Sequence, residues 1–169
     1  MKKIIILTLI FLVSCAPKEI PADQLVLRDG TWYEIGSQSP FSGKSIEYWE
    51  NGQLYEITNY KDGLEDGLFE SYYENGQLMT KGNWKDGKAE GLTVVYNEDG
   101  QFQTRSNFRN GEFHGINENY WSNGQIRSRS NYKDGLRDGL YQRYDENGQL
   151  TESIIYKDGK AIETDSDGR

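Results

Sequence analysis

Few side chains in this sequence have the types and spacing that chemistry requires. The chain of 169 residues holds one histidine, His114, and one cysteine, Cys15. A nucleophilic pair or a typical zinc site needs further histidine or free cysteine side chains beside the first. Carboxylate pairs such as Glu98 and Asp99 fall in predicted turns, where Asp stabilises the backbone through local hydrogen bonds. We therefore expect no catalytic residue, no metal site and no cofactor, and predict that the protein is not an enzyme.

The only cysteine lies where an export signal would end. Lys2 and Lys3 precede an apolar run that is short for a membrane span and closes in Leu-Val-Ser-Cys15. This ending resembles the lipobox of bacterial lipoproteins. The resemblance implies cleavage before Cys15, a diacylglycerol on its thiol and an acylated amino terminus, which together anchor a protein firmly to a membrane. It places the protein in a bacterial cell envelope. Ala16 after the cysteine favours the outer membrane in a Gram-negative cell.

The charge of the chain limits the class of partner. The formal net charge is −8, and loss of Lys2 and Lys3 with the signal would make it about −10. Nucleic acids and anionic lipid headgroups bind basic patches. We therefore expect no nucleic-acid partner, and membrane contact through the lipid anchor alone.

The remaining sequence repeats itself every 24 residues, which is the strongest signal it contains. One glycine column is Gly52, Gly76, Gly100, Gly124 and Gly148, each followed by glutamine. Two other glycine columns keep the same step: Gly43, Gly67, Gly91, Gly115 and Gly139, and Gly63, Gly87, Gly111, Gly135 and Gly159. A tyrosine column (Tyr48, Tyr72, Tyr96, Tyr120, Tyr144) and a mixed aromatic column (Tyr60, Trp84, Phe108, Tyr132, Tyr156) run with them.

These columns predict an all-β fold. Helical periodicity is absent, and glycine-bearing turns bound short runs rich in Tyr, Thr, Val and Trp. Each repeat should be a β-hairpin, and five copies plus a divergent first one should form an elongated antiparallel meander. Three-residue loops, 74–76 and 85–87, would place Leu68, Tyr72, Leu78, Trp84 and Leu92 on one apolar face. Phe69, Ser71, Lys81 and Asn83 would lie on the opposite face. Residues left over in each repeat predict a kink at the Gly67 column.

Three aromatic residues precede the Asn-Gly turns and could bind a partner. Trp49, Tyr73 and Trp121 lie by this register on the polar face, where Asn97 and Asp145 occupy the same column. Exposed rings at a repeat spacing could stack on sugars or anchor a protein. Cross-strand packing with neighbouring side chains is the alternative role.

The wording of the repeat is similar to that of a known family. Tyr-x-x-Asn-Gly-Gln-Leu alternates with aromatic-Lys-Asp-Gly, and this pattern resembles the MORN-type repeat in the variant of bacterial YwqK-family antitoxin-like proteins. The resemblance covers about residues 25–160 and implies scaffolding, or neutralisation of a toxin.

The predicted organisation has four parts: a signal peptide (1–14), a lipidated cysteine with a tether (15–24), the repeat domain (25–160) and a polar tail (161–169). The sequence thus favours a lipid-anchored, non-enzymatic scaffold for a protein partner. Binding of a carbohydrate or another envelope polymer through Trp49, Tyr73 and Trp121, and antitoxin-like neutralisation, remain alternatives.

Overall fold

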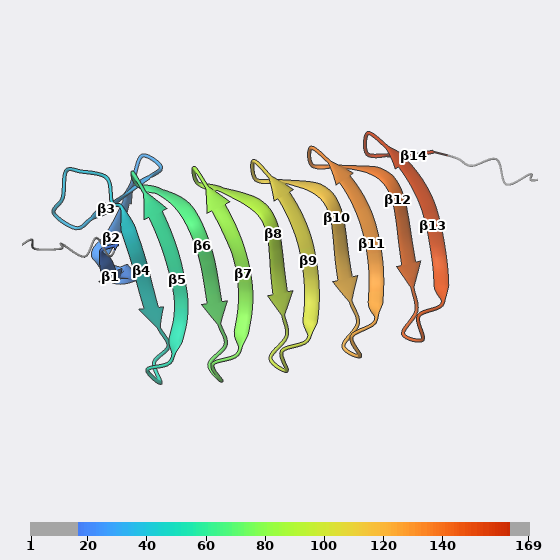
Figure 1. The fold of residues 1–169 in the computed structure, drawn as a ribbon, viewed down its shortest axis with the longest axis horizontal. Coiled ribbons are helices and arrows are strands. Elements are labelled where there is room, and N and C mark those ends of the chain that lie inside the picture. The colour runs from blue at the N-terminus through green and yellow to red at the C-terminus, as the bar shows by residue number, and fades with distance from the viewer. Residues whose placement is uncertain (1–16, 163–169) are drawn as a thin grey trace, which may run out of the picture.

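The protein is a ribbon of hairpins in a single layer, as seen in a computed structural model that describes residues 17–162 (Figure 1). In this part of the chain a twelve-stranded sheet has the order β1-β4-β5-β6-β7-β8-β9-β10-β11-β12-β13-β14, and β2 and β3 form a separate hairpin. The strands are β1 (Glu19–Pro21), β2 (Leu25–Arg28), β3 (Thr31–Glu34), β4 (Gly43–Tyr48), β5 (Leu54–Lys61), β6 (Leu64–Tyr72), β7 (Leu78–Lys85), β8 (Lys88–Tyr96), β9 (Phe102–Arg109), β10 (Glu112–Tyr120), β11 (Ile126–Lys133), β12 (Leu136–Tyr144), β13 (Leu150–Lys157) and β14 (Lys160–Ile162). The prediction of an antiparallel meander of repeated hairpins is confirmed.

The Asn-Gly turns have the predicted three-residue loop. Tyr72 pairs with Leu78, and the amide of Gly76 donates to the carbonyl of Tyr73 at 2.9 Å. Gly76 has φ +82°, the left-handed conformation that closes such a loop and that glycine adopts without steric cost. One step further the register shifts, because Ser71 pairs with Thr80 and Met79 is left over as a bulge.

The prediction of a three-residue loop for the Asp-Gly turns was wrong. Lys85 pairs with Lys88, so the loop is the two residues Asp86 and Gly87, and Trp84 faces Ala89 instead of Lys88. Both loop residues have positive φ, 49° and 75°, which is the type I′ geometry that matches the twist of a hairpin. Aspartate tolerates this conformation because its short side chain can bond locally.

The kink predicted at the Gly67 column is confirmed. The pairing of β5 with β6 slips by two residues between Thr58 and Tyr60, and Gly67 lies within the slip with φ +115°. The same slip recurs in the pairings of β7 with β8, β9 with β10 and β11 with β12. A regular pairing of the strands would use fewer residues than each repeat contains. The slip and the bulge after each Asn-Gly turn accommodate the extra residues.

The bulges also decide which side chains share a face. Face 1 carries Leu68, Glu70 and Tyr72 with their paired neighbours, and face 2 carries Gly67, Phe69 and Ser71 with theirs. The predicted faces were therefore partly wrong. Leu68, Tyr72, Leu78 and Leu92 do share face 1, but Trp84 lies on face 2, and Lys81 and Asn83 lie on face 1. The extra residue Met79 reverses the alternation in the strand that follows it.

The amino-terminal end of the sheet is covered by other parts of the chain. β1 pairs in parallel with β4, so the folded part begins before residue 25, inside the segment predicted as a tether. The β2–β3 hairpin docks on the first repeat, where the amide of Trp32 donates to the carbonyl of Gly63 at 2.8 Å. Phe41 is 4% exposed, and its ring lies 5.7 Å from that of Tyr60. This end holds Ile20 and Phe41, which are 8% and 4% exposed and are the two buried apolar side chains among the described residues.

The rest of the sheet is one layer thick. Helical structure in residues 17–162 amounts to a single 3₁₀ turn, Ala22–Gln24, and no helix there is long and apolar enough to cross a membrane. In Figure 1 the strands from β5 to β13 lie side by side with no second layer over them.

Candidate interaction surface

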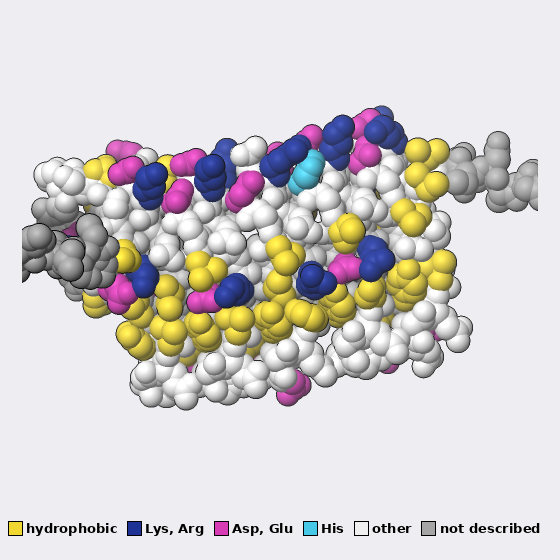
Figure 2. All heavy atoms as spheres, in the orientation of Figure 1, with side chains coloured by type: hydrophobic (Ala, Val, Ile, Leu, Met, Phe, Trp, Pro, Cys, Tyr) yellow, Lys and Arg dark blue, Asp and Glu magenta, His cyan; other side chains and the backbone are white. Residues whose placement is uncertain are grey.

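An apolar stripe crosses face 1 beside the Asn-Gly turns. It consists of the last residue of each incoming strand and the first residue of the next: Tyr48, Leu54, Tyr72, Leu78, Tyr96, Phe102, Tyr120, Ile126, Tyr144 and Leu150. Figure 2 shows it as a continuous band of hydrophobic side chains along the length of the molecule. The stripe exists because each three-residue loop pairs a tyrosine with an aliphatic residue or Phe102.

The stripe is ordered internally but open to solvent. The Phe102 ring lies 5.2 Å from that of Tyr96 and 5.7 Å from that of Tyr120, so aromatic side chains support one another from strand to strand. Tyr48 nevertheless keeps 60% of its surface exposed, Leu150 52% and Phe102 43%. Soluble monomeric proteins rarely expose a large contiguous apolar patch, and such patches usually mark interaction sites.

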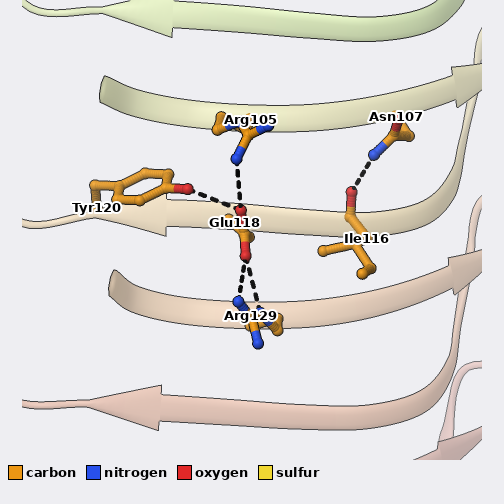
Figure 3. A network of polar contacts seen from close by, with 6 residues as sticks. All are labelled: Arg105, Asn107, Ile116, Glu118, Tyr120 and Arg129. Atoms are coloured by element: carbon orange, nitrogen blue, oxygen red, sulfur yellow. Dashed lines mark hydrogen bonds and ion pairs between the residues drawn. The ribbon is translucent and has the colours of Figure 1, made fainter. Parts of the chain in front are cut away.

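A charged ladder runs beside the stripe on face 1. Its members are Glu70 on β6, Lys81 on β7, Arg105 on β9, Glu118 on β10 and Arg129 on β11. Lys81 binds Glu70 at 2.8 Å, and the Nε and Nη2 atoms of Arg129 donate to the Oε1 atom of Glu118 at 2.9 and 2.7 Å. In Figure 3 Arg105, Arg129 and Tyr120 all point at the Glu118 carboxylate.

Glu118 is held as a carboxylate by these neighbours. Burial alone would raise its pKa, but the hydrogen bonds from Tyr120 and Arg129 and the charge of Arg105 outweigh burial and lower it. Burial raises the pKa of the Tyr120 hydroxyl. The Glu118 carboxylate raises it further, because it accepts the hydrogen bond of that hydroxyl at 2.7 Å. The sequence pattern did not reveal the ladder, because the bulges that bring Lys81 and its equivalents to face 1 were not part of the predicted register.

A third row on face 1 alternates asparagine with leucine or isoleucine. Asn107 donates from its side-chain amide to the carbonyl of Ile116 at 2.8 Å, and Asn59 and Asn131 make the equivalent bonds to Leu68 and Leu140. These bonds satisfy carbonyls that the glycine slip removes from the strand ladder. The apolar side chains in the row project outward, and Ile116 keeps 46% of its surface exposed.

Face 2 is packed differently. Its centre carries small polar side chains, of which Thr58 is 3%, Ser71 2% and Ser106 5% exposed. Gly82 belongs to the same row, and a Cβ atom there would lie 2.7 Å from the hydroxyl of Thr93. Toward the Asp-Gly turns, aromatic rings fill the surface in pairs such as Phe108 with Phe113, 4.8 Å apart. The rings of Phe108 and Phe113 are half-buried, so face 2 is less exposed than the stripe of face 1.

Trp49, Tyr73 and Trp121 lie at the Asn-Gly turns, and each braces the next repeat. The indole of Trp49 donates to the backbone carbonyl of Tyr72 at 2.9 Å. The hydroxyl of Tyr73 donates to the backbone carbonyl of Tyr96 at 2.8 Å. The indole of Trp121 donates to the backbone carbonyl of Tyr144 at 3.1 Å. All three rings are half-buried. The Trp49 ring also lies 4.4 Å from the ring of Tyr55 on the neighbouring strand, which is the cross-strand packing given as the alternative role. Partner binding by the three rings stays a prediction.

Two open hollows adjoin these rings. One of about 500 Å³ is lined by Trp121, Arg143, Asp145 and Glu152 with two neighbours, and one of about 380 Å³ by Trp49, Tyr73, Glu74, Asn75 and Glu98. Both hollows combine an aromatic side chain with carboxylates; the first adds the guanidinium of Arg143 and the second the amide of Asn75. Polar groups beside an aromatic surface can orient a bound ligand.

His114 lies on the opposite edge of the sheet, among the Asp-Gly turns. In other repeats its column supplies a carboxylate to the next turn, as where Glu90 accepts the amide of Asn110 at 2.9 Å. His114 instead lies with its Nδ1 atom 3.4 Å from Asp134. Within residues 17–162 no three His, Cys, Asp or Glu side chains gather as metal ligands. Cys15 lies outside the described residues.

Repeated hairpins in one layer, tied together at both rows of turns, define a β-hairpin repeat protein with an exposed face. The chain belongs to the MORN repeat variant family, whose model matches residues 42–62, 65–86, 113–134 and 137–158. Strands β8 and β9 lie between the second and third matches and adopt the same hairpin. A search of the curated proteins returns no match to this chain.

Proposed function

We propose that this protein is a non-enzymatic scaffold of the bacterial cell envelope that binds another protein through face 1. The observation that carries the proposal is the apolar stripe, which crosses ten strands and leaves Tyr48, Phe102 and Leu150 between 43 and 60% exposed. Aromatic side chains are enriched at protein interfaces, and a single-layer sheet presents them on a broad, open surface.

The charged ladder adds orientation to this apolar surface. Arg105 and Arg129 keep 42% of their side chains exposed while they contact Glu118, so each can reach a partner as well. Charges beside an apolar patch set the register of a complex and the rate of encounter more than its strength. A protein with an apolar strip and matching charges fits this face, and nucleic acid does not fit the chain's net charge of −8.

The envelope location rests on the lipobox-like sequence that ends at Cys15. A lipid on this residue would tether a folded part that begins at Glu19, so the sheet would stay close to the membrane surface. Metabolic labelling with a palmitate analogue tests this step: the unchanged chain should incorporate label, and Cys15→Ala should not. Label in Cys15→Ala at the level of the unchanged chain would remove the anchor from the proposal.

The protein-binding step is tested by crosslinking in intact cells followed by purification of the chain. We expect one dominant envelope protein with the unchanged chain, a strong reduction with Phe102→Asp, and no reduction with Lys133→Glu. Lys133 is exposed at an Asp-Gly turn, away from the stripe, so it controls for added negative charge. Equal capture by the unchanged chain and both variants would contradict binding through face 1.

A second candidate is carbohydrate binding in the hollows beside Trp49, Tyr73 and Trp121. It is favoured by the pairing of Trp121 with Asp145 and Glu152 in an open hollow. Glycan arrays test it, since binding that disappears in Trp121→Ala and persists in Phe102→Asp would support it over the first candidate. Neutralisation of a toxin would be a special case of protein binding, and the captured partner would then be toxic when expressed alone.

A further inference from the structure

We propose that the protein covering face 1 is a second copy of this chain, packed face to face about a two-fold axis. The axis would run parallel to the strands, midway between β8 and β9. This inference rests on the proposed function, because it names the partner of the same face. It is drawn from the side chains of the stripe and of the ladder. Each of these rows is complementary to a copy of itself in which the order of the strands is reversed.

The stripe favours an axis between two strands. Such an axis reverses the order of the strands but keeps the position along each strand, so stripe lies on stripe and ladder on ladder. Tyrosines occupy β4, β6, β8, β10 and β12, and smaller aliphatic residues or Phe102 occupy the strands between them. Every tyrosine therefore meets a different kind of side chain in the second copy: Tyr72 lies over Ile126 and Tyr120 over Leu78. Alternating large and smaller side chains interdigitate between packed sheets.

The ladder selects the axis between β8 and β9. In that register Glu70 lies over Arg129 of the second copy, and Lys81 lies over Glu118 of the second copy. The symmetry repeats both pairs, so four opposite-charge pairs form and no like charges meet. Moving the axis onto β8 places Lys81 over Arg105 and Glu70 over Glu118. Like charges that face each other across an interface are strongly unfavourable, which excludes that register.

The size of face 1 suits this arrangement. The axis lies at the middle of the ten strands from β4 to β13, so all ten overlap. At about 4.8 Å per strand and about 3.3 Å per residue, three rows of side chains over ten strands cover on the order of 900 Å² per copy. A stable interface buries about 800 Å² per partner.

Electrostatics do not oppose the pairing at its centre. The whole chain carries a net charge of −8. Face 1 differs, because its ladder holds Lys81, Arg105 and Arg129 against Glu70 and Glu118. Two acidic molecules can therefore approach through a row of side chains that carries no net negative charge.

Analytical ultracentrifugation of the full chain in mild detergent, with charge-reversal variants, tests the inference. We expect the unchanged chain to dimerise below about 100 µM, and Lys81→Glu to weaken the dimer at least about tenfold, because the introduced carboxylate would face Glu118 of the second copy. Glu118→Lys should weaken it for the converse reason. An equimolar mixture of the two variants should form heterodimers about as tight as the original dimer, because each substitution then faces its complement. Lys133→Glu, the matched charge control, should leave the dimer unchanged.

Each outcome has a defined meaning. Loss of dimer in Lys81→Glu with restoration in the mixture supports the axis between β8 and β9. If circular dichroism shows that Glu118→Lys does not fold, the inference is decided by the dimer affinities of Lys81→Glu and Phe102→Asp compared with that of Lys133→Glu. A monomeric unchanged chain at about 100 µM, or equal weakening by Lys133→Glu, overturns the inference. A monomer that still crosslinks to another protein at face 1 in cells leaves the proposed function standing, whereas a monomer with no crosslink at face 1 contradicts both.

Discussion

The two faces of this sheet come from the same hairpins, yet they treat side chains in opposite ways. On face 2, Thr58 and Ser71 are 3% and 2% exposed, and small residues at the centre let the neighbouring strands pack without a second layer. On face 1, Tyr48 and Leu150 are 60% and 52% exposed, although their types would suit a protein core. The difference indicates that face 2 and the turns stabilise the ribbon, while the apolar surface of face 1 remains available for association.

The largest expected effect lies at Phe41, whose ring packs against Tyr60 of face 2. Phe41→Ala should lower the free energy of unfolding by about 3–5 kcal/mol, because it removes a buried ring and leaves a cavity. Tyr48→Ala on face 1 should cost less than about 1 kcal/mol, since more than half of its surface is already exposed. Urea unfolding followed by circular dichroism measures both. Equal losses would mean that the two faces share the structural role.

The glycine slips, which set the membership of the faces, should show the next largest effect. Gly139 has φ +111°, and an added Cβ atom would lie 3.2 Å from the Cβ of Asn131. Gly139→Ala should therefore cost about 2–3 kcal/mol from backbone strain and crowding. Gly91→Ala is the matched comparison, because Gly91 has φ +75° and no atom within 4 Å, and it should cost about 1 kcal/mol. A smaller loss at Gly139 than at Gly91 would contradict the importance of the asparagine contact.

Glu118 should make the stability of face 1 depend on pH. Its pKa is lowered in the folded protein, so the unfolded chain, with a Glu pKa of about 4.3, binds this proton first. The stabilisation by the Glu118 carboxylate is complete above the pKa of the unfolded chain and is lost as the pH falls through the lower pKa of the folded protein. Glu118→Gln should lower stability at pH 7 by about 1–2 kcal/mol and flatten the decline in acid. Denaturant unfolding at pH 7 and pH 3.5 checks this, and an unchanged decline in Glu118→Gln would show that other carboxylates cause it.

The smallest expected effect concerns the turn aromatics. Trp121→Phe keeps a ring but removes the indole donor that binds the carbonyl of Tyr144, so it should cost about 0.5–1 kcal/mol. Thermal unfolding compared with Trp121→Ala, which also loses the ring, separates the hydrogen bond from the packing. If Trp121→Phe equals the unchanged chain in stability, the brace between repeats is not carried by this hydrogen bond.

The repeat, the hairpins, the Asn-Gly loop and the position of the kink could all be predicted from the sequence, because glycine columns at a fixed step mark positions that need unusual backbone conformations. The membership of the faces could not be predicted completely. Asp86 adopts a positive φ, which shortens the Asp-Gly loop to two residues. The bulge at Met79 is not marked by a characteristic residue type, so the sequence pattern does not reveal it. For that reason Trp84 was assigned to the wrong face and the charged ladder was not anticipated.

The division of labour between the faces is tested most directly by photo-crosslinking in living cells. A photoreactive phenylalanine analogue would replace Phe102 at the middle of the stripe in one variant and Tyr141 on face 2 in another. The Phe102 position should give a discrete protein adduct, whether with a second copy or with another protein, and the Tyr141 position should give none. An adduct at Tyr141 without one at Phe102 would contradict the assignment of face 1 as the interaction surface.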